Sequence, residues 1–186
     1  FNVKKKRILA LFLAAVSCLS LAVSASAANT PNRKATDFRD FDRSAWYAEA
    51  VSAAVDNGLL YGKSSSIIDP NGDMTRAEMA AIINRSFGCY AKADISKYKD
   101  VSKDKWYFED VAMAVQMGTY NGRSNTAMAP DAPITRQEAM TVVARALELD
   151  YDAYAKTDLS AFSDRSEISN WAMPYVRAMV GADYIH

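Results

Sequence analysis

TRAEMAAIINRSF at residues 75–87 and TRQEAMTVVARAL at residues 135–147 are two copies of one pattern, separated by 60 residues (135 minus 75). In each copy a Thr is followed three residues later by a Glu, which is the capping-box signature of a helix N-terminus. Apolar residues then recur at helical spacing, as Met79, Ile82, Ile83 and Phe87 in the first copy and Ala139, Val142, Val143 and Leu147 in the second. The sequence therefore predicts two equivalent helices.

The same offset extends far beyond these helices. Trp46 recurs as Trp106, and Gly58 recurs as Gly118. Other ungapped matches are Asp40 with Asp100, Tyr47 with Tyr107, Val51 with Val111, Val55 with Val115, Gly62 with Gly122, Pro70 with Pro130 and Arg85 with Arg145. A third copy begins near Phe162, where Trp171, Val176 and Val180 repeat the spacing after one extra residue upstream. Self-similarity at a fixed offset predicts an array of structural repeats.

Each repeat contains a second predicted helix, which precedes the helix with the capping box. In the first repeat it should begin near Ser44, and its apolar stripe consists of Trp46, Ala50, Val51, Ala54 and Val55. Asn57 and Gly58 then predict a left-handed C-terminal stop. Loops rich in Gly, Ser, Asn, Asp and Pro follow at residues 62–72 and 122–133, and such surface loops commonly carry binding groups.

The N-terminus has the pattern of a secretory signal peptide. Basic residues 4–7 precede an apolar run at residues 8–23 and small residues that predict cleavage after Ala27. Lipidation at Cys18 is disfavoured because Ala15 stands where a lipobox has Leu. The expected organisation is a signal peptide at 1–27, a linker at 28–37, repeats at 38–97 and 98–147, a linker at 148–160 and a truncated third repeat at 161–186.

Composition excludes several classes of function. Removal of the signal peptide takes away four of the 22 basic residues and none of the 22 acidic ones, which leaves a net charge of about minus four. Nucleic acid is an unlikely partner for such a chain, because that binding needs a basic face. Cys89 is the only remaining cysteine, so no intramolecular disulfide is expected. No second long apolar run suggests a membrane span in the mature chain.

The termini suggest a piece of a longer protein, because the chain starts with Phe1 and stops at His186 within a recognisable pattern. We therefore expect further domains beyond the C-terminus. No enzyme, cofactor or metal site is expected. The single His is His186, and no phosphate loop or nucleophile elbow is present. Residues 69–73 alternate as in a calcium loop, but Met74 stands where that loop needs Gly.

The chain contains an aromatic residue with Asp, a Trp-Tyr pair, an Ala-Val helix that stops at Gly, a loop that ends at Pro and two Thr-Arg-x-Glu segments. Taken together, these motifs resemble the S-layer homology domain family over about residues 38–186. The resemblance implies a mainly α fold, in which the repeats form a three-pronged pseudo-trimer around a central helical bundle. It also implies that grooves between the prongs bind secondary cell wall polysaccharide, commonly pyruvylated, and so hold an exported protein on the bacterial cell wall or S-layer.

The candidate glycan-binding residues are Arg76, Arg136, Trp46, Trp106, Asp40, Asp100, Gly62 and Gly122. Both arginines should lie in the first turn of a helix, where a guanidinium fork and free backbone N–H groups can together hold a carboxylate. The tryptophans lie on apolar stripes, so they serve the core, a sugar ring, or both. The aspartates are first of all turn residues. The glycines first of all permit unusual backbone angles, with backbone contact to a sugar as a second role.

Two other functions remain open at this point. A helical repeat scaffold can bind another surface protein, as solenoid arrays do. A glycan-acting enzyme would need a carboxylate pair that nothing in the spacing favours. Loss of wall pyruvylation would separate the first alternative from a glycan anchor, because only the anchor should lose its attachment.

Overall fold

The computed structural model describes residues 33–186, so the predicted signal peptide and the first half of the predicted linker, residues 28–32, lie outside the described residues. The elements are η2 (Ala35–Asp37), α2 (Ala48–Asp56), α3 (Arg76–Phe87), α4 (Phe108–Gln116), α5 (Arg136–Ala146), η3 (Arg165–Glu167) and α6 (Met173–Gly181). Within this part of the chain there is no strand, only an isolated bridge between Thr75 and Pro133. The predicted mainly α class is confirmed.

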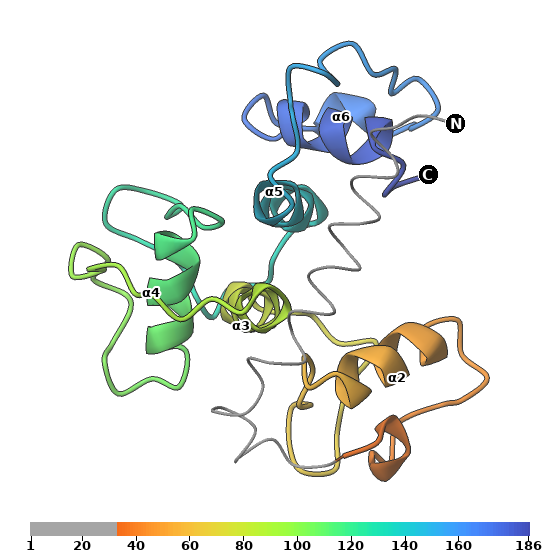
Figure 1. Cartoon of the computed structure of the whole chain (residues 1–186), viewed down its shortest axis with the longest axis vertical. Helices are drawn as coiled ribbons and strands as arrows, with labels where there is room; N and C mark the ends of the chain where they lie inside the picture. Colours follow the sequence, from red (N-terminus) through yellow and green to blue (C-terminus); the bar gives the residue numbers. More distant parts are fainter. Residues whose placement is uncertain (1–32) are drawn as a thin grey trace.

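The second helix of each repeat packs on the first helix of the next one. Helix α3 lies against α4, α5 lies against α6, and α3 also contacts α5. Figure 1 shows α3 and α5 end-on near the centre, while the parts that carry α2, α4 and α6 point outward in three directions. A pseudo-trimer needs a third central helix, which residues 33–186 do not contain, so that arrangement stays a prediction.

The capping boxes form as predicted. The Thr75 hydroxyl accepts the Glu78 N–H at 3.2 Å, and the Glu78 carboxylate accepts the Thr75 N–H at 2.8 Å. Thr135 and Glu138 make the same pair of bonds at 3.3 and 2.9 Å. Each box satisfies N–H groups that have no partner inside the helix. Helices α3 and α5 therefore begin at Arg76 and Arg136, directly after the predicted caps.

The first helices are shorter than expected, and this overturns the prediction that the tryptophans join the core. Helix α2 begins at Ala48, so Trp46 lies before it and is 92% exposed. Trp106 is likewise 60% exposed. Tyr47 and Tyr107 take the buried place, and each meets its neighbouring indole edge to face. The predicted left-handed stops are confirmed by positive φ angles at the two matching glycines, Gly58 and Gly118.

The central helices bury small side chains where larger ones were predicted. Of the four apolar residues expected on the inner face of α3, only Ile83 is buried, and Phe87 is 44% exposed. The other buried positions of α3 are Arg76, Ala77, Ala80, Ala81 and Asn84. Small residues allow the backbones of neighbouring helices to approach closely. The spacing of apolar residues alone therefore did not distinguish the buried face of α3 from the face beside it.

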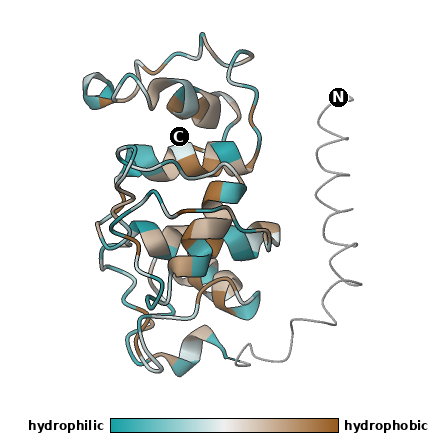
Figure 2. Cartoon of the chain, turned by 90° about the vertical axis from the view of Figure 1, so that its left-hand side faces the viewer, coloured by the Kyte–Doolittle hydropathy of each residue, from teal (hydrophilic) through white to brown (hydrophobic). Residues whose placement is uncertain are grey.

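The largest hydrophobic cluster joins α3, α4 and α5, and it includes Ala80, Ile83, Val111 and Val142. Smaller clusters lie under the loops of the first and third repeats, around Phe38 and Val55 and around Leu159 and Val176. Figure 2 shows hydrophobic residues concentrated on the stacked helices, with many hydrophilic residues in the outer loops. The core thus holds the helices together and leaves the loops on the surface.

Substitution of Thr75 by Ala should lower the free energy of unfolding by about 1 kcal/mol, because the Glu78 N–H loses its acceptor. Thr126→Ala is the matched control, since Thr126 lies exposed in a loop and its hydroxyl makes no hydrogen bond within residues 33–186. Urea unfolding followed by circular dichroism measures both variants. Equal stability of the two variants would contradict the capping role.

Candidate binding grooves

The two predicted aspartates close the loops of their repeats. The Asp40 carboxylate accepts the N–H groups of Ile68 and Asp69 at 3.0 and 2.7 Å. Asp100 accepts those of Met128 and Ala129 at 2.9 and 2.7 Å. The hydrogen bond from Ile68 is the largest cause that holds the pKa of Asp40 below its ordinary value. Neither aspartate lines a groove described below.

The two predicted glycines let the loops pack closely on an aromatic ring. A Cβ at Gly62 would come within 2.5 Å of the Phe38 ring, and a Cβ at Gly122 would come equally close to the Tyr98 ring. Gly62 also has a φ of +82°, which side chains rarely adopt. The structural role of these glycines is therefore sufficient to explain them, although both line a groove.

Arg76 is buried and its side chain is fully engaged by the second repeat. Its guanidinium donates to the Glu138 carboxylate at 2.8 Å and to the carbonyls of Met128 and Asn121 at 3.0 and 3.3 Å. It also lies 5.2 Å from the centre of the Tyr120 ring. Only 4% of the residue is exposed. The guanidinium of Arg76 therefore already has protein partners, and ligand contact by this residue, which lines the second groove defined below, stays a prediction.

The backbone N–H groups beside Arg76 are occupied as well. The N–H of Arg76 donates to the carbonyl of Ala132 at 3.0 Å, and that of Ala77 donates to the carbonyl of Pro130 at 2.9 Å. These groups were expected to be free for a ligand. The loop of the second repeat instead satisfies them, because a helix N-terminus buried against protein needs such acceptors.

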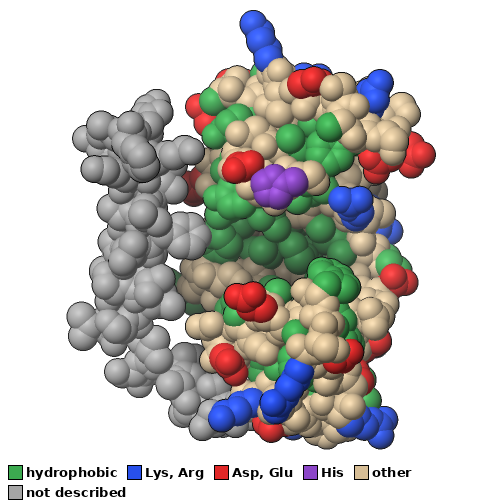
Figure 3. All heavy atoms as spheres, turned by 90° about the vertical axis from the view of Figure 1, so that its right-hand side faces the viewer, with side chains coloured by type: hydrophobic (Ala, Val, Ile, Leu, Met, Phe, Trp, Pro, Cys, Tyr) green, Lys and Arg blue, Asp and Glu red, His purple; other side chains and the backbone are tan. Residues whose placement is uncertain are grey.

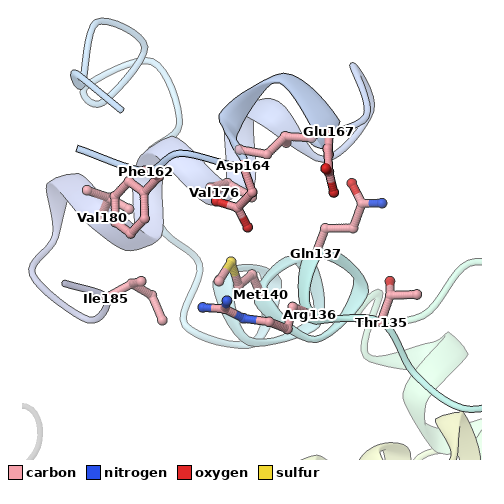
Figure 4. Close-up of a pocket in the computed structure, with 11 residues that line it drawn as sticks. Thr135, Arg136, Gln137, Met140, Phe162, Asp164, Glu167, Val176, Val180 and Ile185 are labelled. Carbon is pink, nitrogen blue, oxygen red and sulfur yellow. The ribbon is translucent and has the colours of Figure 1, made fainter. Parts of the chain in front are cut away.

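Arg136 occupies the same position in its motif but has a different environment. It is exposed, and within residues 33–186 its side chain makes no hydrogen bond or ion pair. It lies at the edge of a separate pocket of about 270 Å³ between α5 and the third repeat. Figure 4 shows Arg136 beside Met140, with Val176 and Ile185 across the pocket. This pocket is mostly apolar.

Two further hollows lie at equivalent places in the first two repeats. We define the first groove, with a volume of about 500 Å³, by Tyr61, Gly62, Lys63, Asp69, Asp73, Glu78, Arg85 and Trp106. We define the second groove, with a volume of about 280 Å³, by Arg76, Asn121, Gly122, Arg123, Glu138, Arg145 and Trp171. Each groove is bounded by the loop and second helix of one repeat and by the tryptophan of the next. The structure thus brings Gly62 together with Trp106, and Gly122 together with Arg76.

The tryptophans project into solvent at the groove edges. Trp106 is 60% exposed and Trp171 is 52% exposed, which is unusual for large apolar side chains. Trp46 has the equivalent place in the first repeat, but it lines neither groove. An exposed indole beside a charged cleft can hold a ligand that has both apolar and polar faces.

Each groove contains an ion pair between its loop and its helix. Lys63 meets Glu78 at 2.6 Å, and Arg123 donates to both Glu138 oxygens at 3.1 Å. Burial alone would raise the pKa of both glutamates, but the bonds from Lys63 and Thr75 lower the pKa of Glu78 below its ordinary value. The bonds from Arg123 and Thr135, with the nearby Arg76 charge, do the same for Glu138. Both carboxylates are therefore ionised at neutral pH.

One arginine in each groove, Arg85 in the first and Arg145 in the second, was missed as a site residue. Arg85 donates to the Leu59 carbonyl at 3.0 Å and lies 4.1 Å from the centre of the Tyr61 ring. Arg145 donates to the Tyr175 hydroxyl at 3.0 Å and lies 4.8 Å from that ring. Arg85 and Arg145 had matched each other at the 60-residue offset, and Trp171 had matched the earlier tryptophans by its spacing to Val176 and Val180, so the repeat itself contained the signal.

Metal binding and membrane spanning have no support in the part of the chain that the structure describes. No group of three or more His, Cys, Asp or Glu side chains in residues 33–186 has a geometry that could hold a metal ion. Among the same residues, no helix has both the length and the apolar character needed to cross a bilayer.

Comparisons with known proteins identify a domain family in this chain and longer relatives that are similar to it. Residues 37–80 and 97–140 each match the family model of the S-layer homology domain. The chain is 34% identical over 170 residues to the Surface-layer 125 kDa protein of Lysinibacillus sphaericus, a match that covers 91% of this chain and 14% of the relative. It is 26% identical over 175 residues to an endoglucanase of Bacillus sp. strain KSM-635, with 92% and 18% covered. A cellulosome-anchoring protein of Acetivibrio thermocellus is 25% identical over 135 residues, with 68% and 29% covered.

The chain thus spans less than a third of the length of these relatives. The three relatives are a surface-layer protein, an endoglucanase and a cellulosome-anchoring protein, and each is similar to this chain over only a part of its own length.

Replacement of Arg76 by Ala should lower the free energy of unfolding by about 3 kcal/mol, because it breaks a buried ion pair and leaves two loop carbonyls without a donor. Arg136→Ala is the matched control from the same motif position, and it should change stability by less than about 0.5 kcal/mol. Thermal and urea unfolding measure both variants. Similar effects at the two positions would contradict the difference in environment.

Glu138→Gln should destabilise the protein at neutral pH and have little effect in acid. A carboxylate whose pKa is lowered by folding contributes stability above its ordinary pKa of 4.5, and that contribution disappears as the pH falls through the folded value. Melting temperatures from pH 7 to pH 3 test this. Glu109→Gln serves as the control, because that side chain is 66% exposed in its pair with Lys92. A constant difference from wild type across this range would contradict the assignment.

Proposed function

The chain belongs to the S-layer homology domain family, and from that membership we propose that it anchors an exported protein to the bacterial cell envelope. The proposed ligand is a secondary cell wall polysaccharide, in its pyruvylated form, that binds non-covalently in the two grooves. The anchored part would be a further domain of a larger protein, as the greater length of the relatives suggests. We propose no catalysis by this segment.

The recurrence of one groove at two equivalent places is the observation that carries this proposal. Each groove offers an exposed indole, a guanidinium stacked on or near an aromatic ring, and a glycine-containing loop. A sugar ring has an apolar face that suits an indole, while its hydroxyl or carboxylate groups suit a guanidinium. Two such grooves on one chain also favour a polymeric ligand. A polymer that is held in one groove presents its other units to the second groove at a high effective concentration.

In the first groove we assign ligand contact to Trp106 and Arg85, and in the second groove to Trp171 and Arg145. Arg76 receives a positioning role, since its donors already bind the loop that forms the second groove. The two grooves also include Gly62 and Gly122, whose missing side chains bring the backbone close to the surface. Asp40 and Asp100 support the loops from behind.

A third central helix would complete the arrangement that the family resemblance implies. Helices α4 and α6 each pack on the second helix of the preceding repeat, whereas α2 contacts only η2 among the described elements. Figure 3 shows apolar side chains gathered in the hollow between the part that carries α6 and the part that carries α2. We propose that a third Thr-Arg-x-Glu helix packs there and completes a three-pronged pseudo-trimer.

The double variant Trp106→Ala and Trp171→Ala should bind cell wall roughly tenfold more weakly than wild type, a change equivalent to about 1.4 kcal/mol. Pull-down with purified wall from a bacterium that pyruvylates its wall polysaccharide measures this. Tyr90→Ala is the control, because Tyr90 is 86% exposed and lines neither groove.

Wall from a strain that lacks pyruvylation completes the same experiment. The wild-type chain should sediment poorly with that wall. Undiminished binding to it, or to wall stripped of polysaccharide, would overturn the glycan proposal and favour a scaffold that binds a surface protein.

A further inference from the structure

The two grooves share their architecture but differ in charge. Resting on the proposed function above, we propose that the second groove takes the acidic sugar of the wall glycan, whereas the first groove takes a neutral sugar. Asp69 and Asp73 are the residues that exclude an anion from the first groove. The two grooves would then bind different sugar units of one polymer.

The first groove has more carboxylates than cations. Lys63 and Arg85 are its two cationic side chains, and Glu78, Asp69 and Asp73 are its three carboxylates. Glu78 already occupies Lys63, with Nζ to oxygen distances of 2.6 and 2.7 Å. Within residues 33–186, the other two carboxylates make no hydrogen bond or ion pair, so their charges are not neutralised by a protein partner.

The second groove has the opposite balance. Arg76, Arg123 and Arg145 are its three cationic side chains, and Glu138 is its single carboxylate. Arg76 and Arg123 share that carboxylate, with N to O distances of 2.8 and 3.1 Å. No carboxylate pairs with Arg145, whose described partners are the Thr119 carbonyl and the Tyr175 hydroxyl. The groove therefore carries two positive charges in excess, against one negative charge in excess in the first groove.

Two substitutions between the repeats cause most of this difference. The positions of Asp69 and Asp73 correspond at the 60-residue offset to Ala129 and Pro133. Asp69 and Ala129 have the same left-handed φ of 54°, so the loop keeps its path while the charge changes. Asp tolerates that conformation better than Ala does. The backbone therefore does not require Ala at position 129.

The charge difference acts on ligand choice through simple electrostatics. A carboxylate in the second groove meets a positive field within a few ångströms, while the same group in the first groove meets two unpaired carboxylates. The first groove is also the larger, at about 500 Å³ against about 280 Å³. It has room for an uncharged sugar with bulky substituents. Because the second groove is partly exposed, added salt should weaken its binding of an anion.

Isothermal titration calorimetry with two probes tests the proposal. The probes are a purified pyruvylated wall oligosaccharide and the same oligosaccharide after mild acid has removed its pyruvate. The wild-type chain should bind one molecule of the pyruvylated probe, with an affinity that falls as salt rises. Ala129→Asp should weaken that binding by roughly tenfold, because it places an uncompensated negative charge on the loop that bounds the second groove, at the position that corresponds to Asp69.

The reciprocal variant, Asp69→Asn with Asp73→Asn, should create a second site for the pyruvylated probe and raise the stoichiometry from one to two. Asp56→Asn is the control, since this exposed residue of α2 lines neither groove. Two equal sites in the wild-type chain, or no change in either variant, would overturn the proposed difference between the grooves. Failure of both probes to bind at all would instead overturn the proposed function.

Discussion

The docking of the α3 N-terminus on the loop of the second repeat is the interaction on which the rest of the structure depends. Two backbone N–H groups of α3 donate to the loop carbonyls of Ala132 and Pro130, and the Arg76 guanidinium reaches Met128 and Glu138. A helix end buried without such partners would leave unsatisfied donors. The bonds therefore define where the second repeat sits relative to the first, and the second groove forms at this junction.

One motif has two tertiary environments in this chain. Thr75 and Thr135 make the same capping box, since capping needs only residues within the motif. The following arginine depends instead on what lies beyond the helix end. Arg76 meets a loop that supplies carbonyls and a carboxylate, whereas Arg136 lies exposed beside an apolar pocket. The shared Thr and Glu thus give the same capping box in both helices, while burial and charge pairing are set by the neighbouring repeat.

This division explains how far the fold and the site could be predicted. The helix caps at Thr75 and Thr135 and the stop at Gly58 depend on local rules, and they were predicted correctly. The burial of Trp46 depends on where the helix begins, and that expectation was wrong. The partners of Arg76 depend on contacts between repeats, which the motif does not contain. A stripe at helical spacing cannot say where the helix begins within it. Nor can a motif say whether its polar groups meet a ligand or another part of the chain.

The repeats also show which positions can diverge without loss of the fold. Gly62 and Gly122 are held by contact with an aromatic ring, and the loop aspartates are held by backbone N–H groups. Positions 69 and 73 line the first groove and make no side-chain hydrogen bond within residues 33–186, so a change there alters the charge of the groove without the loss of such a bond. Two copies that must share one backbone can therefore still differ in what they bind. The difference in charge between the grooves arises at the positions that the fold does not constrain.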